Sequence, residues 1–128
     1  MENLLYVTLL EKTATYKRMN KAAVIRHVDN IRKLDDDGNM ELCGVLRKCP
    51  GFAGMIILKA NSYEEAQELC EREPLVIDGY CTYKLMSLQV GNRENNYWPP
   101  CTIRQPTLAS TQECPGGKHF VAGDIIAN

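Results

Sequence analysis

The sequence has almost no net charge, because 15 Lys and Arg residues stand against 16 Asp and Glu residues. Proteins that bind nucleic acid or anionic membranes usually carry a strong basic field, so this balance argues against both partners. Long apolar runs are also absent. The run 4–10 ends at Glu11 and Lys12, far short of a membrane span, and no basic region precedes it as in an export signal. We therefore expect a cytoplasmic protein.

Recognised metal and redox motifs are absent as well. The 6 cysteines include no C-x-x-C pair. Cys101, Cys114 and His119 have neither the spacing nor the number of ligands of a zinc finger. Cys43 and Cys49 flank an expected hairpin, which leaves a contact between them as an alternative. In a chain without an export signal we expect reduced thiols, and we predict no metal and no cofactor.

What the sequence does contain is the pattern of one α+β domain. Its 128 residues are enough for a single core. Asn20 is a suitable N-cap and Gly38 a suitable stop for a first helix, Ser62 and Glu65 form a capping box for a second, and Pro74 should end that helix. Short apolar and β-branched runs predict the strands. We expect strands at 4–10, 40–46, 52–60 and 80–90, and helices at 20–37 and from 62 to the residue before Pro74.

The order βαββαβ predicts a ferredoxin-like fold. Right-handed crossovers place both helices on one face of a four-stranded antiparallel sheet, with the first and third strands in the middle. The run 52–58 has no polar alternation, so both of its faces should be covered, although the helices cover only one. A second copy of the chain could cover the other face, which predicts a homodimer through the sheet. The residues after Gly91 are a rival cover.

The composition changes after Gly91. Residues 1–91 are expected to form the ferredoxin-like domain, and residues 92–128 a C-terminal extension that is rich in proline and has no sustained periodicity. Tyr97–Pro100 could anchor this extension on the domain or on a partner subunit. A partly disordered extension is the other interpretation that remains open.

Two ionisable residues fall inside the apolar arcs of the expected helices. His27 lies between Ile31 and Leu34 at helical spacing and should face the sheet. Glu73 lies in the apolar arc at the C-terminal end of the second helix, where the helix dipole disfavours a carboxylate and burial without a partner is costly. Because the two helices run antiparallel, Glu73 should come within reach of His27. Such a pair would orient and charge the imidazole as a general acid or base near neutral pH.

Plainer interpretations also remain open. His27 could be a core histidine bonded to a backbone carbonyl, and Glu73 could lie in water at a frayed helix end, with Asp78 as the second candidate carboxylate. We interpret Asp35–Asp37 as a solvated helix end, because the run lacks the alternating oxygen ligands of a calcium loop. Residues 115–118 lack the pattern of a phosphate-binding loop.

The motifs His27-x10-Gly38, Ser62-x-Glu64-Glu65-Ala66 and Glu73-Pro74-x4-Gly79, taken in this order, resemble the YciI-like (YCII-related) family over about residues 3–91. The resemblance implies a dimeric α/β barrel, in which two sheets pack face to face and a cleft lies between helices and sheet. It also implies a catalytic His-Asp pair, which corresponds here to His27 and Glu73.

The chain departs from this family pattern in two places. Glu73 replaces the aspartate and adds a methylene, and Val24 stands where many relatives have a basic residue, three positions before the histidine. Members thought to be enzymes act on small, often aromatic-derived compounds, for example by dehydrochlorination. The related barrel superfamily includes muconolactone isomerases and monooxygenases, and its proton transfer or oxygenation needs no cofactor.

Two functional hypotheses follow. The first is a cofactor-free lyase or isomerase acting on a small molecule, in which His27 moves a proton and Glu73 holds its tautomer. The second is a non-catalytic small-molecule-binding or assembly domain with a structural histidine. An apolar pocket with His27 on its wall would favour a ligand site, whereas a filled core would favour the structural role.

Overall fold

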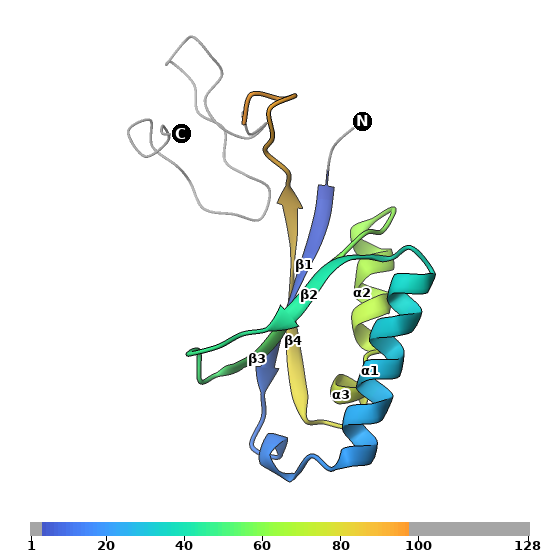
Figure 1. The fold of residues 1–128 in the computed structure, drawn as a ribbon, viewed down its shortest axis with the longest axis vertical. Coiled ribbons are helices and arrows are strands. Elements are labelled where there is room, and N and C mark those ends of the chain that lie inside the picture. Colours follow the sequence, from blue (N-terminus) through green and yellow to red (C-terminus); the bar gives the residue numbers. More distant parts are fainter. Residues whose placement is uncertain (1–3, 98–128) are drawn as a thin grey trace. The chain divides into compact units, whose positions relative to one another are not determined.

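The protein is described by a computed structural model, which defines residues 4–97. The secondary structure follows the expected order, with additional short helices (Figure 1). In chain order, the elements are β1 (Leu4–Lys12), η1 (Tyr16–Arg18), α1 (Lys21–Asp36), β2 (Met40–Val45), β3 (Phe52–Leu58), α2 (Tyr63–Glu71), α3 (Pro74–Ile77) and β4 (Cys81–Gln89).

The strands form one four-stranded antiparallel sheet in the order β2-β3-β1-β4. β1 and β3 are the central strands, as the apolar runs predicted. Their register pairs Val7 with Ile57, and β2 adds Leu42 opposite Ile57. The predicted α+β ferredoxin-like fold is confirmed, with strand boundaries that differ from the expected ones by at most a few residues.

The helix caps match the sequence pattern. The Asn20 side chain accepts a hydrogen bond from the backbone N–H of Ala23 at 2.8 Å, and this cap fixes the start of α1. Gly38, with φ of +79°, supplies the left-handed residue after its end. Ser62 accepts from the backbone N–H of Glu65 at 3.0 Å and caps α2. These local signals were sufficient to predict both long helices.

The prediction that the second helix continues to the residue before Pro74 was wrong. α2 ends at Glu71, and Pro74 opens the separate helix α3. Proline is well suited to the first position of a helix, because its φ is already helical and the N–H that it lacks would have no partner there. The η1 turn was likewise not predicted.

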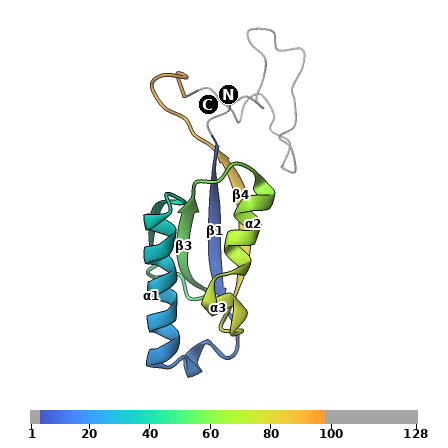
Figure 2. The same ribbon diagram turned by 90° about the vertical axis from the view of Figure 1, so that its right-hand side faces the viewer.

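Both long helices pack on the same face of the sheet (Figure 1). In the view of Figure 2, α1 lies on the side of β3, α2 lies on the side of β4, and β1 runs between them. The core beneath them is apolar. Its most buried members include Tyr6, Leu10, Leu34, Ile56, Leu58, Leu69, Leu75 and Cys81.

The opposite face of the sheet, which we call the open face, is also apolar. Strand alternation and register place its side chains away from the helices. Leu42, Met86 and Leu88 on this face are 57%, 41% and 40% exposed. The apolar part of the open face comprises Leu5, Val7, Leu9, Leu42, Ile57, Met86 and Leu88, and strand alternation places Lys84 on this face as well. The predicted homodimer through it stays a prediction.

Residues 89–97 are the described part of a second unit of the chain, separate from residues 4–88. Within it, Asn92 and Asn95 cap each other: each backbone N–H donates to the side-chain oxygen of the other, at 2.9 and 3.0 Å. The predicted 92–128 extension lies mostly outside the described residues and stays a prediction. Among residues 4–97, no helix combines the length and apolarity needed to cross a bilayer.

Candidate functional site

His27 lies in the second turn of α1, and its position follows from the Asn20 cap that fixes where the helix begins. Its side chain is 25% exposed, so it is neither in free solvent nor sealed in the core. Leu75 of α3 and residues of the sheet line the same cavity as His27. The expected orientation of His27 towards the sheet is therefore only partly reached, and the ring stays accessible to a ligand.

Glu73 is buried, with 2% of its surface exposed. It is the N-cap of α3, and its Oε2 accepts a hydrogen bond from the backbone N–H of Leu75 at 3.0 Å. This corrects the expectation that the carboxylate lies against an unfavourable helix dipole. Because Pro74 starts a new helix, Glu73 stands at a helix N-terminus, where backbone N–H groups stabilise negative charge.

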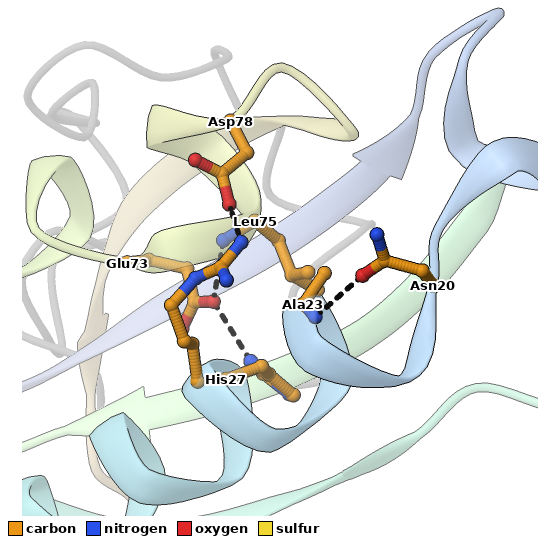
Figure 3. Close-up of polar contacts among 7 residues, drawn as sticks. Asn20, Ala23, His27, Glu73, Leu75 and Asp78 are labelled. Carbon is orange, nitrogen blue, oxygen red and sulfur yellow. Dashed lines mark hydrogen bonds and ion pairs between the residues drawn. The ribbon is translucent and has the colours of Figure 1, made fainter.

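The structure brings His27 and Glu73 into contact (Figure 3). Nδ1 of His27 lies 2.7 Å from Oε2 of Glu73, and the Nδ2 amide of Asn30 donates to Oε1 at 3.1 Å. The interpretations that leave Glu73 in water, or His27 bonded to a backbone carbonyl through Nδ1, do not describe this arrangement. The carboxylate is thus bonded on both oxygens.

These contacts assign the imidazole tautomer. An ionised carboxylate only accepts hydrogen bonds, so Nδ1 of His27 must carry the proton that it shares with Glu73. Nε2 is then left with a lone pair when the ring is neutral. A base with one nitrogen anchored by a carboxylate and the other available is the arrangement used for proton abstraction.

His27 lies on the wall of a cavity of about 400 Å³ between α1, η1 and the strands β1, β2 and β3. The helix side is apolar, with Val24, Val28 and Ile31. Among the described residues, no Asp, Glu, Lys or Arg lines this cavity. Its walls suit the apolar part of a small organic molecule, and His27 is the ionisable group that such a molecule would meet.

Small residues form part of the cavity floor. Cys43, Gly44, Ala53 and Gly54 line it on β2 and β3. Gly54 has a further reason to be glycine, since a Cβ there would come within 2.8 Å of the Gly44 carbonyl oxygen. The close approach of the two strands therefore excludes a side chain at a position where one would enter the cavity.

The other candidate carboxylates lie elsewhere. Asp78 pairs with Arg26, whose Nη2 lies 2.6 Å from Oδ2, and both side chains are partly exposed. Asp35–Asp37 end α1, where Lys33 pairs with Asp37 at 3.0 Å. No group of ligating residues suited to a metal ion occurs in the part of the chain that the structure describes. Cys101, Cys114, His119 and segment 115–118 lie outside it.

The cysteines at 43, 49, 70 and 81 are free thiols, so Cys43 and Cys49 are not bridged. Cys70 and Cys81 are buried close to the site. Burial raises the pKa of the Cys81 thiol to about 11, and the charge of Glu73 acts in the same direction. Burial also raises the pKa of Cys70, against the opposing effect of its hydrogen bond with Thr8. Both thiols are therefore poor nucleophiles at neutral pH.

The sequence did not identify Asn30 or the small residues that line the cavity, although the family resemblance implied a cleft between helices and sheet. Asn30 lies three residues after His27 on α1, which places both side chains on the same helix face towards Glu73. That spacing was a usable signal. The small residues of the floor come from two strands, and only the strand register shows that they are neighbours.

No family model and no curated protein sequence matches this chain. A solved structure that does resemble it is the 5-chloro-2-hydroxyhydroquinone dehydrochlorinase TftG from Burkholderia phenoliruptrix AC1100, in complex with 2,5-dihydroxybenzoquinone. The two chains are 13% identical with a TM-score of 0.55, and the match covers 72% of this chain and 99% of that chain. At this identity, the likeness supports the fold.

Proposed function

We propose that the chain is a cofactor-free enzyme of the lyase or isomerase type, in which His27 moves a proton of a small molecule bound beneath α1. One observation carries the proposal. A histidine paired at 2.7 Å with a buried carboxylate lies on the wall of an apolar cavity of about 400 Å³. The similarity of the fold to that of a dehydrochlorinase and the YciI-like motifs agree with this class of chemistry.

The roles of the residues follow from their bonds. Nε2 of His27 removes a proton from a carbon of the bound molecule, and Glu73 stabilises the imidazolium that forms. In a lyase, the electron pair left on carbon expels a leaving group. In an isomerase, His27 returns the proton to another carbon. Asn30 and the Leu75 N–H hold the carboxylate in place throughout.

A proton-exchange assay tests this function without knowledge of the natural substrate. Small hydroxyquinones and phenols, starting with 2,5-dihydroxybenzoquinone, the ligand in the similar structure, are incubated in deuterated water, and the loss of C–H signals is followed by NMR. We expect the protein to accelerate exchange for some compounds. His27→Asn should lower this acceleration by about 100-fold or more.

Asp78→Asn is the matched control for Glu73→Gln, since each replaces a carboxylate near α3 by its amide. Glu73→Gln should lose most of the acceleration and Asp78→Asn should keep it, because Asp78 pairs only with the exposed Arg26. Exchange that is undiminished in His27→Asn would contradict the proposal. Binding without any exchange would favour the non-catalytic small-molecule-binding domain instead.

The proposal includes a homodimer in the dimeric α/β-barrel arrangement. The open face supports it, since an apolar sheet face of this kind is costly to leave in water. Light scattering at micromolar concentration should report a dimer. Leu42→Glu together with Met86→Glu should give a folded monomer. Ile77→Glu, which changes an exposed residue on α3, should leave the protein a dimer. A monomeric wild type would contradict this part. The expected cytoplasmic location stays a prediction.

A further inference from the structure

A second hollow lies next to the cavity below α1, at the end of β1. Both are lined by Tyr16, Met19 and Val24, so the two spaces adjoin. The second hollow differs in its chemistry. Lys12 and Lys17 line it, whereas no charged residue among those described lines the first. A ligand that extends from His27 past these shared residues would therefore pass from an apolar wall to a basic rim.

The basic rim belongs to a longer basic stretch of the sequence. Between Glu11 and Asp29, the sequence contains Lys12, Lys17, Arg18, Lys21 and Arg26 and no acidic residue, although the whole chain has a charge of −1. Arg26 is neutralised by Asp78. Within residues 4–97, none of the ion pairs involves Lys12 or Lys17. Their charges remain available to a ligand.

Hydrogen bonds hold the end of β1, which carries Lys12, and the segment that leads to η1, which carries Lys17. The Thr13 hydroxyl donates to the Gly79 carbonyl at 2.7 Å, and the Thr15 hydroxyl donates to the same carbonyl at 2.9 Å. The backbone N–H of Lys12 donates to Gly51 at 3.0 Å. In addition, the Lys12 ammonium lies 5.0 Å from the centre of the Tyr16 ring. A preorganised cation loses less entropy on binding than a mobile one.

We infer that the ligand of this cleft is amphipathic, with an apolar part of ring size in the His27 cavity and an anionic group held by Lys12 and Lys17. The inference rests on the proposed function in taking the His27 cavity as the substrate site, and it adds the charge of the substrate. A carboxylate, sulfonate or phosphate would each satisfy the lysines, since an ammonium recognises charge without a fixed geometry.

Two fluorescent probes with nearly the same apolar skeleton test the inference. Anilinonaphthalene sulfonate carries an anionic group, and N-phenylnaphthylamine does not. We expect the double substitution Lys12→Met and Lys17→Met to lower the affinity for the sulfonate probe about 5-fold. The affinity for the neutral probe should not change. Methionine keeps the apolar stem of each lysine. Lys17→Met alone, which does not disturb the Tyr16 contact, should show a smaller loss in the same direction.

Matched controls separate this effect from others. Lys33→Met with Lys59→Met removes the same charge away from both hollows and should change neither affinity. Val28→Trp fills the cavity from the partly exposed face of α1 and should abolish binding of both probes. High salt should reduce the preference for the sulfonate probe, because it screens exposed charges.

The outcomes distinguish this inference from the proposed function. If both probes bind and the lysine substitutions do not change the sulfonate affinity, the inference fails and the proposed function stands. If neither probe binds, or if Val28→Trp leaves both affinities intact, the cavity is not a site for organic molecules and both proposals fall. A selective loss of sulfonate binding in Lys12→Met with Lys17→Met supports the inference.

Discussion

The two long helices cover neighbouring parts of the same sheet face, and they cover them differently. α2 buries Ala66, Leu69 and Cys70 completely or nearly so, at 0%, 8% and 3% exposure. On α1, Val24 and Val28 remain 44% and 36% exposed although they point towards the sheet side, because the space beneath them is hollow. α1 does bury Ala23 and Leu34, at 0% and 6% exposure, but between them it covers a cavity, whereas α2 covers packed core.

The His27–Glu73 pair lies where these two regions meet. Glu73 follows the packed helix α2, and His27 stands on the helix that roofs the cavity. The carboxylate is therefore held in the packed region, while the imidazole lies on the wall of the cavity. Catalytic groups gain precision when their support is packed and bonded in this way.

The largest expected difference between the two regions is in core packing. Leu69→Ala removes a side chain that is 8% exposed and should lower the free energy of unfolding by about 3 to 4 kcal/mol. Val28→Ala, at the cavity, should cost less than about 1 kcal/mol, because little packing is lost there. Urea denaturation measures both. Equal losses would show that the cavity is filled in solution, and the difference in packing between the two regions would then not exist.

Glu73 should make the next largest contribution to the free energy of unfolding. Glu73→Ala removes the cap of α3, worth about 1 kcal/mol, and charge-assisted bonds worth about 2 kcal/mol, so we expect a loss of about 3 kcal/mol. Asp78→Ala should cost at most about 0.5 kcal/mol, since its partner Arg26 is half exposed. Urea denaturation of the two variants compares them. A loss below 1 kcal/mol for Glu73→Ala would mean that the carboxylate is solvated.

A smaller effect concerns alkaline pH. The Cys81 thiol has a pKa of about 11 in the folded chain, raised by burial from an ordinary value of 9.0. Between these values the unfolded chain holds fewer protons than the folded chain, so stability falls as pH rises. Cys81→Ala should reduce this fall by about 2 kcal/mol between pH 9 and 11. Cys49→Ala, at a partly exposed thiol, should not. Urea denaturation at each pH, with reductant present, measures the change.

The order of helices and strands could be predicted because it depends on local sequence signals. The caps at Asn20 and Ser62 and the apolar strands are properties of neighbouring residues, and they led to the correct element order. The topology predicted the contact between His27 and Glu73. Glu73 was expected at the end of the second helix, but it is the N-cap of α3. A proline can end one helix or begin the next, and its position alone does not decide which.

The cavity and Asn30 depend on information that one stretch of sequence does not contain. Whether space remains under Val28 depends on Gly54, where the Gly44 carbonyl of the paired strand β2 comes too close to leave room for a side chain. The role of Asn30 requires knowing where α3 places the second oxygen of Glu73. Both are properties of packing between elements distant in sequence.

Glu73 should hold His27 as the tautomer with the proton on Nδ1, which leaves Nε2 unprotonated. Long-range ¹H–¹⁵N NMR of the histidine rings, at a pH where the imidazole is neutral, tests it directly, with His119→Gln to assign the signals. We expect a protonated Nδ1 and an unprotonated Nε2 for His27. A proton on Nε2, or a mixture of tautomers like that of free histidine, would contradict it.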